Sequence, residues 1–163
     1  METAELLFQI LCLGVAATIM MDIWLLLLKR LHLPSLNFAL LGRWVGWMFR
    51  GKFIHVSIAQ SPAIRREYAL GWLAHYSVGI LFAFSFVQIV GETWLLQPQF
   101  TSAFIFGVIT VLIPFFIMQP AMGVGIASAK TAQPLRNCLR SLINHAIFGC
   151  GLYLSALLLA LFH

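Results

Sequence analysis

Four long apolar runs constrain what this chain can fold into more than any other feature. They cover residues 6–28, 69–90, 102–126 and 142–162. Because an α-helix rises about 1.5 Å per residue, each run is about as long as a helix must be to cross the hydrocarbon core of a bilayer. Hydrophobic residues make up 61% of the sequence and charged residues only 9%, so much of the apolar surface must face lipid. The sequence predicts an all-α fold, in which a single integral membrane domain is built as a bundle of four transmembrane helices.

The basic residues indicate how these helices are oriented. Seven of the ten Lys and Arg residues lie in residues 29–68 and three in residues 127–141, whereas residues 91–101 and both ends of the chain have none. By the positive-inside rule the two basic loops are cytoplasmic, and residues 91–101 and both termini lie outside. The basic residues are thus interpreted as topology signals beside a lipid bilayer, and no nucleic-acid partner is expected.

Two segments are expected to depart from straight spanning helices. Residues 38–49 mix tryptophans with basic residues, which favours a helix lying in the membrane interface, although a loop with aromatic anchors explains the same pattern. The third run contains Pro114 and Pro120 followed by two glycines, so its second half is expected to be kinked or broken. Membranes tolerate such a break only where neighbouring groups satisfy the freed backbone, which places the third helix inside the bundle.

Polar side chains within the runs are the candidate functional residues. A carboxylate inside a span is costly unless it is paired or hydrated, so Asp22 is the first of them. His75, Gln119 and His145 each add one polar group from another helix. Counted from the nearest basic residue, Asp22, His75 and His145 lie at similar depths, roughly 8–13 Å inward from the cytoplasmic end. We therefore expect the four residues to converge on one ligand- or proton-binding site in the cytoplasmic half of the bundle.

Further residues are expected to support this site. Hydroxyl and amide side chains nearby are candidate hydrogen-bond partners: Thr18, Thr110 and Asn144. Basic side chains are candidates for contact with charged groups at the cytoplasmic face: Arg43, Arg136 and Arg140. No catalytic residue is assigned.

Several uses of such a cluster remain open. A proton-linked binding site is the plainest, because histidine titrates near neutral pH and Asp22 supplies a charge beside it. Asp22, His75 and His145 are also the ligand types of a transition metal, although they lack the local spacing of a metal motif. His75 and His145 are equally suited to be axial ligands of haem from two helices. The same polar residues are also able to hold the helices together without any ligand.

A short motif recurs in the second and fourth runs. His-x-x-x-Gly occurs at His75 with Gly79 and again at His145 with Gly149. The first and third runs are alike more weakly. Two helix pairs of the same orientation would form a parallel repeat, which is a plan found in some transporters.

Four longer motifs together resemble those of a known family. They are A-T-x-M-M-D at residues 17–22, G-R-W-x-G at 42–46, G-W-x-x-H-Y at 71–76 and P-F-F-x-M-Q-P-A-M-G-x-G at 114–125. Over nearly its whole length the chain is similar to an uncharacterised family of small four-helix bacterial inner-membrane proteins, a domain of unknown function. The resemblance implies a bacterial inner membrane and a compact helical bundle. It assigns no activity, cofactor or partner, and no role to any residue.

The leading hypothesis is a small permease-like protein or accessory subunit that binds a proton-linked solute or ion. Four spans are few for an alternating-access carrier, so a homodimer or a larger membrane complex is expected. One alternative is a haem- or metal-binding membrane oxidoreductase or assembly factor that uses His75 and His145, and another is a structural bundle without a ligand. No phosphate-binding glycine loop or nucleophile elbow occurs, so the sequence favours a protein that is not an enzyme.

Overall fold

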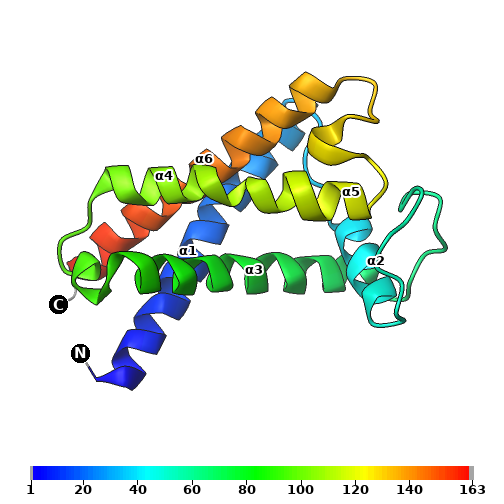
Figure 1. Cartoon of the computed structure of the whole chain (residues 1–163). Coiled ribbons are helices and arrows are strands. Elements are labelled where there is room, and N and C mark those ends of the chain that lie inside the picture. The colour runs from blue at the N-terminus through cyan, green and yellow to red at the C-terminus, as the bar shows by residue number, and fades with distance from the viewer. Residues whose placement is uncertain (1, 162–163) are drawn as a thin grey trace. The chain divides into compact units, whose positions relative to one another are not determined.

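The computed structural model describes residues 2–161, and within that range the chain is helical with no strand (Figure 1). Four helical stretches are long and apolar enough to cross a membrane, namely Thr3–Arg30, Glu67–Val90, Phe100–Ala121 and Pro134–Ala160. The predicted all-α fold class with four spanning helices is thereby confirmed. The fourth stretch begins ahead of its apolar run, because proline is well suited to the first turn of a helix.

Three of these stretches are single helices: α1 (Thr3–Arg30), α3 (Glu67–Val90) and α6 (Pro134–Ala160). The short helix expected in the first basic loop is α2 (Phe38–Met48). It begins where the side chain of Asn37 accepts hydrogen bonds from the backbone N–H groups of Ala39 and Leu40, which have no partner within the helix. A 3-10 turn, η1 (Glu92–Leu95), follows α3.

The third stretch is irregular in its second half. Its first part is α4 (Phe100–Thr110), after which the backbone forms a π-helical turn, η2 (Pro114–Met118), and then the short helix α5 (Gln119–Ala121). Proline removes a helical N–H donor, and a π-helical turn is one way in which a helix absorbs such a defect. Beyond α5, Gly123 adopts a φ of 90° that glycine takes readily, and the chain continues into η3 (Ile126–Ser128).

The described chain divides into two compact units. Unit 1 comprises residues 2–35, 76–110 and 143–161, and unit 2 comprises residues 36–75 and 111–142. Each unit therefore joins segments that are distant in the sequence. α3 and α6 each contribute one part to unit 1 and another to unit 2.

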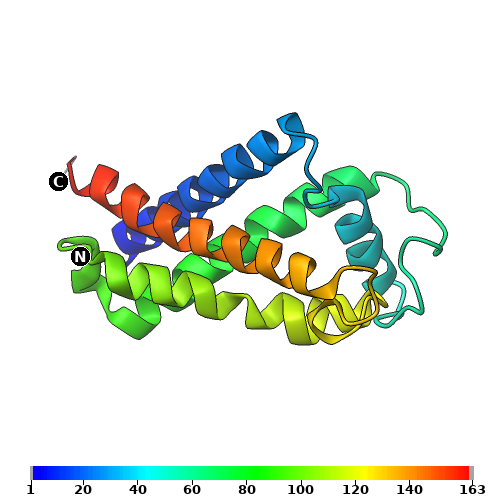
Figure 2. The same ribbon diagram turned by 90° about the horizontal axis from the view of Figure 1, so that it is seen from above.

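Unit 1 is a bundle of α1, α4 and its parts of α3 and α6. Its apolar core draws on all four helices and on η1, and includes the fully buried side chains of Leu13, Phe86 and Leu152. α4 and α6 cross where a Cβ built on Gly107 would come within 2.5 Å of the Gly149 Cα, so glycine is what lets these backbones approach. In both views the start of α1, the turn after α3 and the end of α6 lie at the same end of this bundle (Figures 1 and 2).

Unit 2 is held together by an ion pair between α2 and the start of α3. Arg43 donates from Nε and Nη2 to the Glu67 carboxylate at 2.8 and 2.9 Å, and from Nη1 to backbone carbonyls in residues 58–61. The hydrogen bond to Glu67 raises the pKa of the Arg43 guanidinium above its usual range. Beside this pair the two helices cross closely, because Gly42 and Gly71 have no side chain to separate them. Arg43 thus joins two helices and a loop.

A loop segment of unit 2 is fixed against the break in the third stretch. The backbone N–H groups of His55 and Ile58 donate to the carbonyls of Ala121 and Met122 at 2.8 and 3.0 Å. Gly123 packs so closely on the same segment that a Cβ there would clash with the loop backbone. The loop therefore satisfies carbonyl groups that the end of a helix leaves without partners.

Candidate functional site

Asp22 on α1 is paired with a tyrosine on α3, within unit 1. The Tyr76 hydroxyl donates to Asp22 Oδ2 at 2.7 Å, and both side chains are half-buried. A hydrogen bond to a carboxylate is roughly twice as strong as one between neutral groups. α3 thus supplies a donor at the position where α1 carries an acid.

His145 on α6 is bonded to Thr110 at the end of α4, also within unit 1. Its Nδ1 lies 2.8 Å from Thr110 Oγ1. The Thr110 hydroxyl has one hydrogen, which it donates to the Gly107 carbonyl at 2.5 Å. Thr110 must then accept from His145, so we assign the proton of the neutral imidazole to Nδ1 and the lone pair to Nε2. His145 therefore carries its proton-accepting nitrogen on the side of the ring away from Thr110.

A third hydrogen bond sets the register between α1 and α6. Trp24 Nε1 on α1 donates to Asn144 Oδ1 on α6 at 3.0 Å. Seven residues back along α1, Ala17 packs against Gly151, which lies seven residues further along α6. Equal steps in opposite directions mean that the two antiparallel helices stay in register over this stretch.

By this register Asp22 is level with Ala146, the residue after His145. Tyr76 is bonded to Asp22 and Thr110 to His145, so each of the four helices of unit 1 places one polar side chain at this level. We call these residues the polar layer: Asp22, Tyr76, Thr110 and His145. The layer supplies a carboxylate, a phenol, a hydroxyl and an imidazole, whose shared chemistry is hydrogen bonding and proton exchange. Asp22 and His145 thus lie on adjacent helices at one level.

The predicted site residue His75 belongs to unit 2. It is buried, and its ring lies edge-on to those of Phe38 and Trp72, with centroids 5.1 and 6.2 Å away. The aromatic surroundings come from α2 and from the start of α3. A site that His75 shares with Asp22 and His145 stays a prediction.

Gln119, the fourth predicted site residue, also belongs to unit 2. It is buried in the break of the third stretch, where its Oε1 accepts from Ser128 Oγ at 3.1 Å and its Nε2 donates to Ser141 Oγ at 3.4 Å. The amide joins α5 to η3 and to α6. Its membership of a ligand site likewise stays a prediction.

The other predicted supporting residues have hydrogen-bond partners of their own. In unit 1, Asn144 accepts from Trp24, and Thr18 donates to the carbonyl of Gly14 in its own helix. In unit 2 the bonds of the predicted basic residues run from Arg43 to Glu67, from Arg136 to Gln133 and from Arg140 to Asn137.

The sequence pattern assigns no site role to two residues that the structure distinguishes. Tyr76 completes the polar layer, and its position one helical turn before Gly79 is the signal that could have found it. His55 is only 4% exposed in a loop of unit 2. Its Nδ1 lies 2.9 Å from Ser61 Oγ, and its buried Nε2 has no hydrogen-bond partner in the described chain. No periodic pattern marks a buried histidine in a loop.

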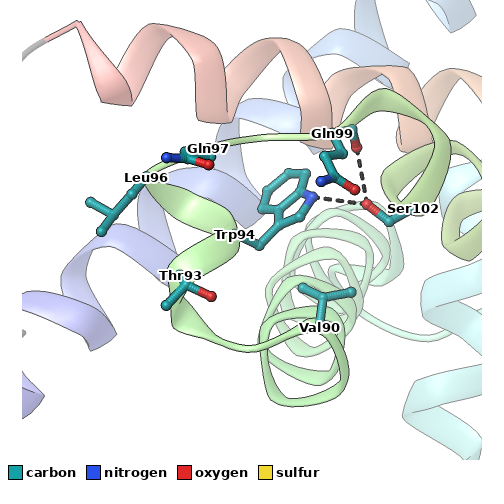
Figure 3. A pocket seen from close by; sticks show the side chains of 7 residues that line it. All are labelled: Val90, Thr93, Trp94, Leu96, Gln97, Gln99 and Ser102. Carbon is teal, nitrogen blue, oxygen red and sulfur yellow. Dashed lines mark hydrogen bonds between the residues drawn. The ribbon is translucent and has the colours of Figure 1, made fainter.

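A hollow of about 540 Å³ opens beside η1 in unit 1 (Figure 3). Its lining residues are all uncharged: Val90, Thr93, Trp94, Leu96, Gln97, Gln99 and Ser102. Trp94 Nε1 donates to Ser102 Oγ at 2.8 Å, and that hydroxyl donates to the Gln99 carbonyl at 3.0 Å. These bonds close the turn between α3 and α4, and the lining has no charged group to mark a specific ligand.

Within residues 2–161 no three His, Cys, Asp or Glu side chains are grouped as a metal ion would require.

The four membrane-length helices and the intramembrane polar layer define a small all-α protein of the membrane-spanning type. The chain belongs to the family described as protein of unknown function (DUF2938), whose model matches residues 11–159. This match confirms the resemblance to an uncharacterised family that the sequence motifs indicate. No curated protein and no solved structure matches the chain.

Proposed function

We propose that this protein binds a proton-linked solute or ion at the polar layer, as a small permease or as an accessory subunit in the bacterial inner membrane. The polar layer carries this proposal, because Asp22 and His145 each bond to a neighbouring helix at one level of unit 1. Ionisable residues within spans are costly, and in membrane proteins they commonly mark ion and proton pathways.

The two ionisable residues suit different parts of a coupled cycle. The Asp22 carboxylate, oriented by Tyr76, supplies negative charge for a cation or for a solute that carries a proton. His145 has its Nδ1–H committed to Thr110 and accepts a proton at Nε2. A proton gained at this level weakens the attraction for a cation, and this electrostatic competition is the coupling that proton-linked binding requires.

We further propose that the two basic loops face the cytoplasm and that both termini lie outside. The uneven distribution of Lys and Arg supports this orientation. The start of α1, the turn after α3 and the end of α6 share one end of unit 1, in keeping with it (Figure 1). Four spans are few for a complete carrier, so we expect a homodimer or a larger complex.

Proton movement is the direct test of this function. The full-length protein is reconstituted into liposomes that contain a pH-sensitive dye, and inorganic cations and small organic solutes are added outside one at a time. We expect at least one of them to drive protons across the membrane with the wild type. Asp22→Asn and His145→Gln should abolish that movement, because each removes a group that exchanges a proton.

Glu92→Gln is the matched control. It also neutralises a carboxylate, but Glu92 is exposed in η1, outside the polar layer. Proton movement should survive this change. The proposal is wrong if Asp22→Asn and His145→Gln behave like the wild type. If no added solute or ion moves protons, the protein is not a permease on its own, and the accessory-subunit form of the proposal alone remains.

A further inference from the structure

One loop of unit 2 exposes a group of apolar side chains that the proposed function does not use. Phe49, Phe53, Ile54 and Val56 are 83, 56, 74 and 95% exposed. Exposed apolar residues on the spanning helices are expected to meet acyl chains, but these four lie in the loop that follows α2. Clustered apolar side chains outside a span mark an interaction surface.

The loop is held in this form by specific bonds. Trp44 Nε1 donates to the Phe53 carbonyl at 2.9 Å, and Trp47 Nε1 donates to the Pro62 carbonyl at 3.1 Å. His55, buried within the same segment, donates its backbone N–H to the break in the third stretch. The inward residues are therefore fixed, and their apolar neighbours are held outward.

Two basic residues stand among the exposed apolar ones. Arg50 and Lys52 are exposed, with their charged groups 5.2 and 5.7 Å from the centroid of the Trp47 ring. Residues 44–66 include no Asp or Glu, and the next acid along the chain, Glu67, is paired with Arg43, so no acidic residue of this segment offsets the charge of Arg50 and Lys52. We call the combined surface the loop tip, which consists of Phe49, Arg50, Lys52, Phe53, Ile54 and Val56.

We propose that the loop tip inserts into the headgroup layer of a leaflet rich in anionic phospholipid. Lipid phosphates complement Arg50 and Lys52, and the boundary between headgroups and acyl chains accommodates the apolar side chains. Each basic residue near an anionic surface contributes roughly a fivefold gain in partitioning. This inference does not depend on Asp22 or His145, so its test is independent of the test of proton-linked binding.

The test uses the full-length chain with Cys12, Cys138 and Cys150 replaced by alanine and one new cysteine, Val56→Cys, carrying an environment-sensitive fluorophore. Position 56 is 95% exposed, so the label does not disturb packing. The protein is placed in nanodiscs of phosphatidylcholine, with or without phosphatidylglycerol, that contain a lipid-borne quencher near the headgroups. We expect blue-shifted emission and strong quenching only when phosphatidylglycerol is present.

Charge variants test the cause of that quenching. Arg50→Gln combined with Lys52→Gln should lower the partitioning of the loop tip, and with it the quenching, by about 25-fold. Arg65→Gln combined with Arg66→Gln removes the same charge from the same loop outside the tip, and should leave it unchanged. A label at Gln60→Cys, which is exposed in the loop but outside the tip, should stay in water.

Three outcomes overturn the proposal. The first is equal quenching by the lipid-borne quencher in nanodiscs with and without phosphatidylglycerol. The second is quenching of the label at position 56 by aqueous iodide in both kinds of nanodisc. The third is a label shielded from lipid-borne and aqueous quenchers alike, which would assign the loop tip to a protein partner or a second copy of the chain.

Discussion

The Tyr76 hydroxyl on α3 stabilises the carboxylate of Asp22 on α1. Asp22 lies in a span, where a carboxylate is stabilised by donors rather than by bulk water, and Tyr76 is such a donor at 2.7 Å. The same logic applies to Thr110, whose bond fixes the tautomer of His145. The chemistry of the polar layer therefore depends on two neutral residues as much as on the two ionisable ones.

Tyr76→Phe removes the hydroxyl and keeps the ring. We expect the free energy of unfolding in detergent to fall by about 1–2 kcal/mol, because Asp22 loses a hydrogen bond within a span. Chemical unfolding followed by circular dichroism measures the change. Tyr68→Phe is the control, since Tyr68 is 60% exposed and its contacts with neighbouring rings survive. If the two variants are equally stable, the Tyr76 bond contributes nothing to the fold.

Arg43→Lys keeps the charge and loses the forked geometry. Lysine cannot bond both oxygens of Glu67 and the loop carbonyls together, so we expect the unfolding free energy to fall by about 2–3 kcal/mol. The loop after α2 should then become open to proteases, and limited proteolysis measures this. Arg65→Lys, at an exposed position, should remain as resistant as the wild type. Unchanged resistance in Arg43→Lys would contradict the role assigned to the ion pair.

At the scale of elements, the glycines of the two His-x-x-x-Gly motifs lie where helices cross in unit 1. Gly79 on α3 lies against Thr18 of α1, and Gly149 on α6 lies against Gly107 of α4. In each pair the glycine admits a neighbouring helix, and about one turn earlier in the sequence a polar side chain, Tyr76 or His145, is bonded to that same neighbour. The likeness between the two helix pairs is therefore one of packing as well as of sequence.

Gly107→Val tests the closer of these crossings. The new side chain would meet the Gly149 backbone, so we expect α4 and α6 to separate and the midpoint of thermal unfolding to drop, with about 2–3 kcal/mol lost. Val78→Ile also adds bulk to a spanning helix, but at a side chain that is 44% exposed, and should cost little. Similar midpoints for both variants would show that the crossing tolerates a side chain.

The sequence predicts some of these elements better than others. The spanning helices are predictable because crossing a bilayer requires about twenty apolar residues, whatever packs beside them. The start of α6 at Pro134 is not, because half of residues 134–141 are charged or polar, so the apolar run begins later than the helix does. The pairing of Tyr76 with Asp22 depends on how two helices are rotated about their axes, which helices apolar on every side leave open.

At the scale of the whole molecule, orientation in the membrane is open to direct measurement. In a chain without its native cysteines, we expect a membrane-impermeant maleimide to label Glu92→Cys on intact cells, and to label Gln60→Cys only after the membrane is permeabilised. Both positions are exposed, and the positive-inside rule predicts that the basic residues near Gln60 are retained on the cytoplasmic side. A gel shift of the labelled protein detects labelling at each position. The reverse labelling pattern would refute the proposed topology.

The interleaving of the two units along the chain has a consequence for biosynthesis. A ribosome delivers α1 and α3 before α6 exists, yet unit 1 requires residues 143–161 and unit 2 requires residues 111–142. Until then the face of α1 that holds Ala17 has no α6 to pack against. Unit 1 is therefore incomplete while α1, α3 and α4 are already synthesised. Emergence of the last helix, rather than insertion of any earlier one, completes unit 1.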